Sequence, residues 1–220
     1  MKKAKMIFNQ IHHITSDLVG TPLCIDQNFP IKNGRTWDTC EIEIPRLKVA
    51  DALKNRSYVD MFQEIDAAKS YNIKLIDGSI IILQYRFQND LLVAHRLAFF
   101  PNPNLSIFQN DPEDYLEDEI YVDVIDPKNV ATPLRFDFDC NDEKASPIEH
   151  PQSHFTIGQY RNCRIPVNRP ITPSQFISFI IRNFYHTAYA KYCDQITTYD
   201  EKMDETIYSE EKSIIHLGIV

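Results

Sequence analysis

Two histidines and two aspartates lie close together in the second half of the sequence. His150 and His154 are four residues apart, and Asp137 and Asp139 shortly precede them. Imidazoles act as general acid and base in phosphodiester cleavage, while carboxylates orient them or bind a metal ion. We therefore predict a catalytic site with His154 as general base or acid and His150 as its partner. Asp137 and Asp139 are expected to be orienting groups or metal ligands.

Guanidinium groups are frequent around these histidines. They bind phosphate or carboxylate groups through paired hydrogen bonds, and they stabilise negative charge that develops during a reaction. An equally open alternative is that they pair with carboxylates of the protein itself, such as Asp137, Asp139 and Glu149. His95-Arg96, earlier in the chain, fits either arrangement. The arginines that we expect to bind substrate are Arg135, Arg161, Arg164 and Arg182.

Two stretches of alternating polarity are expected to position these groups. Between Leu134 and Cys140 every second residue is apolar, and Phe155 and Ile157 repeat the pattern after the histidines. A period of two predicts β-strands. If the strands pair antiparallel, their polar faces must coincide. That face would hold Arg135, Asp137, Asp139, His154 and Thr156, with His150 beside it.

Three other interpretations of the histidines stay open. Two imidazoles with Asp137 and Asp139 form a mixed nitrogen and oxygen ligand set that suits a divalent metal ion. The tripeptide 154–156 has the H-x-T form of two-histidine phosphoesterases, and its only second copy, at 13–15, lies in a segment that we expect to be helical. The third interpretation is that both histidines are structural and hydrogen-bonded within a loop.

One long helix is predicted after the candidate site. Thr172 is a suitable N-cap, Pro173 fits the first helical position and Gln175 completes a capping box. Apolar residues then cover most of the helix circumference as far as Tyr192. Such a helix is largely buried, so we expect it to pack against the sheet.

The remaining pattern predicts an α+β fold in a single domain spanning residues 1–220. We expect a mostly antiparallel sheet packed against the long C-terminal helix. Residues 1–70 are expected to form helical N-terminal segments, near residues 1–20 and 46–70, separated by an irregular stretch with a short edge strand at 41–44. Three antiparallel strands follow from Ile73 to Phe100, beginning with an Asp77-Gly78 hairpin turn. Sheet and main helix occupy 71–193, and 194–220 form an acidic tail.

Composition narrows the function classes. The net charge of −8 argues against broad binding to nucleic acid but leaves room for a local basic groove. The chain has no glycine-rich phosphate loop and no apolar run of the roughly 18 residues that a membrane span needs. Five scattered cysteines without a C-x-x-C pair suit reduced thiols. We expect a cytoplasmic protein without a membrane partner.

An acidic segment offers a separate hypothesis about partners. Residues 109–126 contain eight aspartates and glutamates and no lysine or arginine. Such a run usually forms a solvated surface. The alternative is a docking surface for a basic partner or a mimic of nucleic-acid charge.

Four short sequences carry a resemblance to a family: 135–139, the His-Pro-Gln-Ser-His run at 150–154, 163–167 and 182–185. The chain resembles an uncharacterised prokaryotic family, domain of unknown function 2290. It is also loosely similar to toxin-like and antiphage-defence proteins. This resemblance implies a prokaryotic defence context and supplies no catalytic residues.

Together these observations lead to two functional hypotheses. The first is a defence-associated protein whose histidine, aspartate and arginine site acts on a phosphodiester in nucleic acid, with or without a divalent metal ion. The second is a non-catalytic subunit that docks on a larger ATPase or nuclease through its acidic segment and a helix face.

Overall fold

The computed structural model describes residues 2–44, 57–104, 132–141, 143, 145–160 and 162–220. Within these ranges, nine strands form one antiparallel sheet. Its central path runs β1 (Cys24–Gln27), β4 (Ile73–Leu75), β5 (Ile80–Gln88), β6 (Leu91–Phe100), β7 (Leu134–Asp139), β8 (Ser153–Ile157) and β9 (Ile165–Pro166). β3 (Cys40–Glu43) pairs with β5 beside β4, and β2 (Ile31–Asn33) pairs with β3. The expected mixed α+β class is confirmed.

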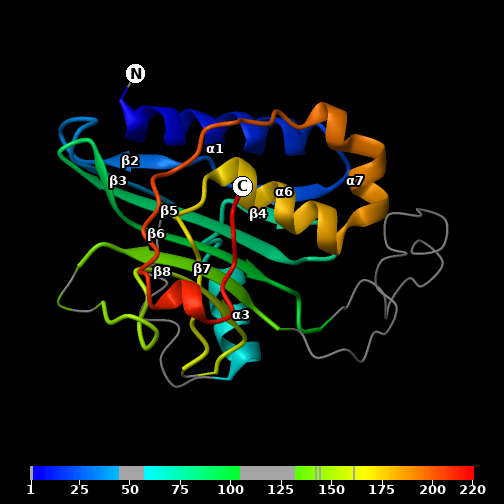
Figure 1. Cartoon of the computed structure of the whole chain (residues 1–220). Helices are drawn as coiled ribbons and strands as arrows, with labels where there is room; N and C mark the ends of the chain where they lie inside the picture. The colour runs from blue at the N-terminus through cyan, green and yellow to red at the C-terminus, as the bar shows by residue number, and fades with distance from the viewer. Residues whose placement is uncertain (1, 45–56, 105–131, 142, 144, 161) are drawn as a thin grey trace.

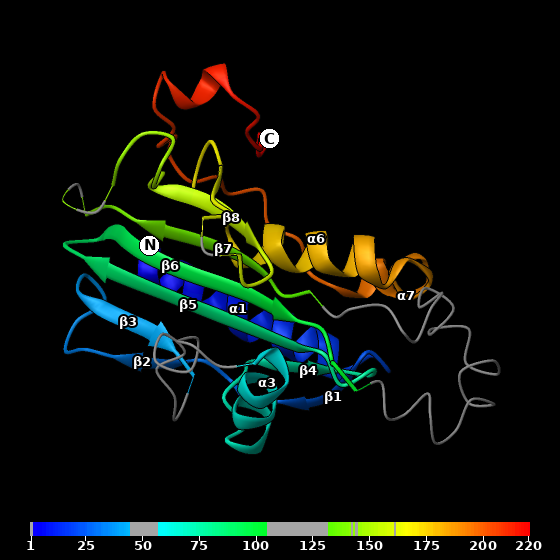
Figure 2. The same ribbon diagram turned by 90° about the horizontal axis from the view of Figure 1, so that it is seen from below.

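Helices cover the two faces of the sheet unequally. α1 (Lys3–Val19) and α6 (Pro173–Phe184) pack on one face, and α3 (Tyr58–Ala67) packs on the other. Figure 2 shows α3 in front of the sheet and α1 behind it. Alternation along β5 explains both contacts, because Ile81 and Leu83 belong to the core under α1 and α6, while Ile80 and Ile82 belong to the core under α3.

β4, β5 and β6 form the predicted meander of three antiparallel strands, and their two turns follow from the residues at the turn positions. Gly78 adopts φ 82°, which a residue with a side chain rarely adopts, between β4 and β5. Asn89 and Asp90 both have positive φ in the two-residue turn between β5 and β6. Two positive φ angles match the twist of the flanking strands, so this turn closes a regular hairpin.

The N-terminal part is less helical than the sequence predicted. The first helix is confirmed as α1, which buries Ile7, Ile11 and Ile14. The described part of the second is α3, which Ser57 caps. The predicted edge strand at 41–44 is confirmed as β3, and the stretch before it, predicted to be irregular, contributes β1 and β2. These strands have three or four residues each, so their stability depends on pairing with the longer β4 and β5 rather than on local preference.

The predicted long C-terminal helix is wrong in its second half. The capping box between Thr172 and Gln175 begins α6 as expected, but α6 ends at Phe184. Tyr185 leaves helical geometry with φ −136° and ψ 50°, and α7 (His186–Tyr192) follows. The Tyr185 hydroxyl donates a hydrogen bond of 2.8 Å to Asp77 Oδ2, a buried carboxylate at the β4–β5 turn. This contact supplies a reason for the break, because it draws Tyr185 toward the sheet.

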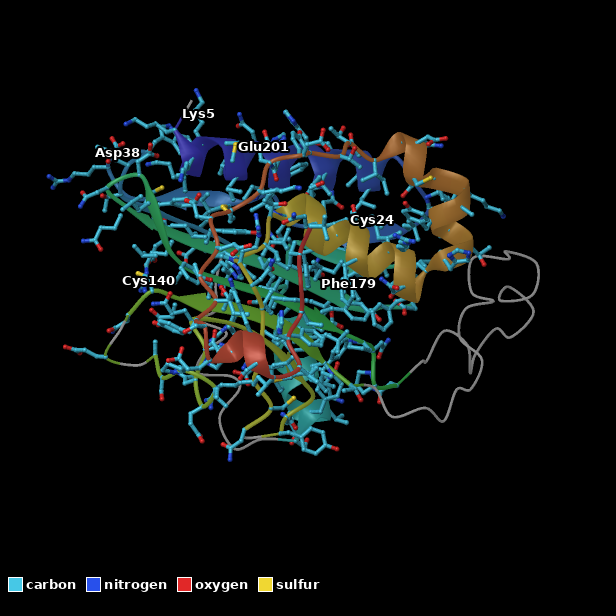
Figure 3. The ribbon with its side chains drawn as sticks, viewed as in Figure 1. Lys5, Cys24, Asp38, Cys140, Phe179 and Glu201 are labelled. Carbon is cyan, nitrogen blue, oxygen red and sulfur yellow. The ribbon has the colours of Figure 1, made fainter. Side chains whose placement is uncertain are left out.

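The segment after α7 is not a free tail. It contains two short 3-10 helices, η2 (Cys193–Gln195) and η3 (Glu211–Ser213), and crosses back along α1 (Figure 1). Glu201 accepts a hydrogen bond from the side chain of Gln10 on α1, and its position beside this helix is visible in Figure 3. Further on, Leu217 forms a bridge with Val167 next to β9. The chain therefore closes over the helical layer and one sheet edge.

Two further findings concern residues named above. No helix among the described residues is both long and apolar enough to cross a membrane. The acidic segment 109–126 lies wholly within 105–131, outside the described residues. Residues 46–56 of the second predicted helix also lie outside them.

A buried histidine ties the sheet to the start of α6. The amide of Ile171 donates to His95 Nε2 at 3.2 Å, while the Ile171 carbonyl accepts from the Tyr85 hydroxyl at 3.0 Å. Tyr85 and His95 are cross-strand neighbours on β5 and β6. Because Nε2 accepts a hydrogen bond, the neutral ring carries its proton on Nδ1. Burial lowers the pKa of His95 to about 4.

We predict that the free energy of unfolding of His95→Gln falls less steeply than that of wild type as the pH is lowered. His95 titrates near its ordinary pKa in the unfolded chain and near 4 in the folded protein, so its contribution is complete above about pH 6.5 and declines as the pH falls toward 4. The loss amounts to about 3 kcal/mol of unfolding free energy across this window. Urea unfolding at several pH values measures the free energy of unfolding of both proteins. The difference between wild type and variant should change by that amount across the window. A difference that stays constant with pH would contradict the prediction.

Candidate functional site

The face of the sheet that α3 covers changes from apolar to polar halfway along its central strands. On β5, Ile80 and Ile82 contact α3, but Gln84 and Arg86 continue the same face beyond it. On β6, Ala98 lies under α3, and Arg96 is the next residue along that face. α3 covers only the apolar half. The polar half, which no helix of the described residues covers, forms a pocket of about 540 Å³.

Five strands and two loops contribute side chains to this pocket. β3, β5, β6, β7 and β8 form its base. The segment between β7 and β8 contributes Ala145, His150 and Pro151, and the segment between β8 and β9 contributes Arg164. The ionisable residues on the exposed face are Glu41, Glu43, Arg86, Arg96, Arg135, Asp137, Asp139, His150, His154 and Arg164. Four carboxylates and four arginines make the pocket mixed in charge.

Asp137 is the centre of this group. Its Oδ1 accepts a hydrogen bond from Arg96 Nε at 2.9 Å, and its Oδ2 accepts one from Arg135 Nε at 2.5 Å. The Asp137 side chain is only 12 % exposed. Burial by itself raises the pKa of this carboxyl, but the charges of Arg96 and Arg135 outweigh burial, so the pKa lies below its ordinary value. One carboxylate thus holds two guanidinium groups side by side.

His154 lies directly beside Asp137 across the β7–β8 pairing. Its Nδ1 donates to the carbonyl of Pro151 at 2.9 Å, which fixes the tautomer and leaves Nε2 without a proton in the neutral ring. Nε2 is 3.7 Å from Asp137 Oδ2. Burial lowers the pKa of His154 and outweighs the opposing effect of Asp137. At neutral pH the ring is therefore uncharged, with a lone pair facing the Asp137 cluster.

A strained turn presents His150 to the same pocket. Glu149 N donates to Pro147 O at 2.8 Å, and Ile148 between them has φ 70°, which together define a γ-turn. Ser146 and His150 close the turn with two backbone hydrogen bonds. The His150 ring lies 5.3 Å from the His154 ring, centroid to centroid. The turn therefore places two imidazoles together at one wall.

The structure brings six of the eight predicted site residues to this pocket: Arg135, Asp137, Asp139, His150, His154 and Arg164. The antiparallel pairing that was expected to gather them is confirmed, with Asp137 opposite His154 and Arg135 opposite Thr156. Arg161 lies outside the described residues.

One expected site residue, Arg182, and one residue of an alternative interpretation, His13, do not reach the pocket. Arg182 is exposed on α6, which packs on the opposite face of the sheet, so it does not reach the pocket. His13, the second histidine of a two-histidine phosphoesterase, lies on α1 and contacts the Tyr199 hydroxyl. It therefore cannot pair with His154.

The mixed metal-ligand set is not assembled either. No group of three or more histidine, cysteine, aspartate or glutamate side chains among the described residues is placed to hold a metal ion. Asp137 is instead engaged by Arg96 and Arg135. The five cysteines, all within the described ranges, are free thiols, and Figure 3 shows Cys24 and Cys140 far apart.

Sequence reasoning left Arg86, Glu41 and Glu43 out of the site and left the place of Arg96 undecided. The signal for Arg86 and Arg96 was present, because β5 and β6 both change from apolar to charged on one face partway along. The two glutamates alternate with buried Cys40 and Ile42 on β3. Only the pairing of Glu41 with Arg86 brings them to the pocket.

A family model described as an uncharacterized conserved protein, DUF2290, matches residues 23–219. The chain belongs to this family. Every strand and loop that lines the pocket lies within the matched range, so the pocket is part of the DUF2290 domain itself. Comparisons with curated proteins and with solved structures found no match.

We predict that Asp137→Asn lowers the free energy of unfolding by about 3 kcal/mol, because it leaves two partly buried guanidinium groups adjacent without an anion. Urea unfolding at pH 7 measures this. Asp139→Asn is the matched control on the same strand and face, and it should cost less than about 1 kcal/mol. Equal losses in the two variants would show that Asp137 does not organise the cluster.

We predict that Ile148→Gly raises stability. A β-branched residue at φ 70° carries strain of about 1–3 kcal/mol, whereas glycine adopts this angle freely. Glycine also increases the conformational entropy of the unfolded chain, which lowers stability by less than about 1 kcal/mol. The Ile148 side chain is 45 % exposed, so little buried contact is lost. Thermal unfolding should show a higher midpoint for Ile148→Gly. Ile148→Val keeps the branched side chain and should leave the midpoint unchanged. A lower midpoint for Ile148→Gly would show that Ile148 is not strained.

Proposed function

We propose that the DUF2290 pocket binds a phosphodiester of a nucleic acid and cleaves it by histidine acid–base chemistry. The observation that supports this most directly is the cluster of Arg96 and Arg135 on Asp137. Both arginines use Nε to bind the carboxylate, and their terminal nitrogens make no hydrogen bond to the described residues. Two guanidinium groups and one carboxylate leave one positive charge with several donors free for phosphate oxygens.

The histidines supply the proton transfers in this proposal. His154 is neutral at pH 7 with an unprotonated Nε2, as a general base requires. It would take the proton from the attacking water or hydroxyl as that oxygen bonds to phosphorus. His150, nearer to solvent, would give a proton to the oxygen that leaves as its bond to phosphorus breaks. Arg96 and Arg135 would stabilise the charge on the non-bridging oxygens.

Other pocket groups have supporting parts. Arg164 lies at the wall beside His154, and its positive charge would favour binding of the negatively charged phosphate. Asp137 is assigned an orienting role toward the arginines, because both of its oxygens accept from them. Whether a divalent ion joins a bound substrate through Asp139 is part of the test below. The defence context that the resemblance implies stays a prediction.

Two observations favour a second function. His154 is buried and its Nδ1 is satisfied, as expected for a structural histidine, while Ile25, Phe29 and Ile31 expose large apolar side chains near the first strands. These features suit a non-catalytic subunit that docks on a larger ATPase or nuclease. The acidic segment proposed to take part lies wholly outside the described residues.

We predict that the wild-type protein cleaves RNA or DNA and that His154→Asn reduces cleavage by about 100-fold or more. Asparagine retains an N–H that can reach the Pro151 carbonyl but removes the base. Both proteins should be incubated with labelled RNA and DNA, with and without Mg²⁺ or Mn²⁺, and followed by gel electrophoresis. Unfolding curves must match between them.

The outcomes separate the two functions. Cleavage that is lost only in His154→Asn supports the catalytic proposal, and its metal dependence chooses the mechanism. Equal cleavage by both proteins refutes the role of His154. Absence of cleavage by wild type under every condition favours the docking subunit.

A further inference from the structure

A second hollow continues the pocket along the sheet. It has a volume of about 360 Å³ and lies where the β2–β3 hairpin meets the end of β5 and the start of β6. We call it the hairpin pocket. Glu41 and Arg86 line both hollows, so the two are neighbours. Together they form an extended binding face rather than one isolated cavity.

The lining of the hairpin pocket differs from that of the histidine pocket. It includes partly buried Val93 and the side-chain amides of Asn33 and Gln88, of which Asn33 donates to Glu43. Cys40 and Phe87 also border it, but they are 4 % and 1 % exposed and belong to the core under α1. A small hollow with one apolar side chain and amide groups at its rim suits a flat heteroaromatic ring that has hydrogen-bonding edges. A nucleic-acid base is such a ring.

Gly34 shapes the wall of this second hollow. Its φ is 123°, and a Cβ added there would lie 2.6 Å from the carbonyl oxygen of Thr39. A side chain at this position would therefore force the two sides of the hairpin apart. Gly34 and Thr39, where the two sides of the hairpin come close together, are both lining residues of the hairpin pocket.

Arg86 stands at the junction of the two hollows. It is exposed and makes no hydrogen bond or ion pair with the described residues. In the β5–β6 register, Arg86 pairs with Ala94, and Gln84 pairs with Arg96. Arg86 is therefore one strand across and two residues along from Arg96, about 8 Å between their Cα atoms by ordinary sheet spacing. A guanidinium group at that separation can bind a second phosphate of the same strand.

We infer that the ligand is a single-stranded nucleic acid that crosses from the histidine pocket into the hairpin pocket. Arg86 binds the phosphate next to the one held by Arg96 and Arg135, and the hairpin pocket takes an unpaired base. A duplex keeps its bases stacked inside, whereas a single strand can place a base in a small hollow. This inference rests on the proposed function and names its substrate class.

The test is a binding measurement on the full chain carrying His154→Asn, which prevents cleavage during the experiment. Fluorescence anisotropy compares a labelled ten-nucleotide single strand with a labelled dinucleoside monophosphate, which has one phosphodiester. Arg86→Gln should weaken binding of the ten-nucleotide strand about five- to tenfold and that of the dinucleotide less than twofold. The slope of log K against log salt for the longer strand should fall in magnitude by about 0.7, as expected for one lost phosphate contact.

Arg182→Gln is the matched control, because Arg182 is an exposed arginine on the opposite side of the sheet. It should leave both affinities and the salt slope unchanged. A duplex of the same sequence should bind more weakly than the single strand.

Three results would overturn the inference while leaving the proposed function intact. Arg86→Gln could weaken both ligands equally, it could weaken neither, or the duplex could bind as tightly as the single strand. If the protein binds neither ligand, and wild type cleaves neither, the proposed function fails and this inference fails with it.

Discussion

The pairing of β5 with β6 is the interaction on which the rest of the structure depends. These two strands are the longest in the described sheet, and they pair from Ile80 opposite Phe100 to Gln88 opposite Leu91. β3 and β4 add to one side of this pair and β7 to the other. Both apolar cores use it, and so does the polar pocket. A slip of one residue would exchange core side chains for pocket side chains, so one register defines both.

The sequence predicted best what local chemistry decides. The Asp77-Gly78 turn, the capping box at Thr172 and the alternation from Leu134 are each readable within a few residues, and each is present in the structure. The break at Tyr185 was not readable, because its hydrogen-bond partner Asp77 lies 108 residues away. The short strands β1 and β2 were missed for a similar reason, since pairing with other strands stabilises them. The strand predicted at 41–44 was found as β3, because its alternation is readable locally.

The candidate site follows the same division. The contributions of β7 and β8 were predictable, because one alternating pattern and one loop carry Asp137, His150 and His154. The contributions of β3 and β5 required the register that sets Glu41 opposite Arg86. Arg182 was misplaced because helical spacing shows which residues share a helix face, but not which side of the sheet the helix covers. The charge balance of the pocket also became visible only when all five strands were in place.

The return of the chain over α1 has a consequence for how the protein is assembled. Hydrogen bonds join Gln10 to Glu201 and Asp17 to Thr197, across 191 and 180 residues of sequence. α1 therefore receives this cover only after 180 to 191 further residues have been synthesised. Until then the outer side of α1 stays exposed to other chains, and contacts of such long separation form slowly. A nascent molecule thus carries an unfinished surface on α1 over the whole interval between the two segments.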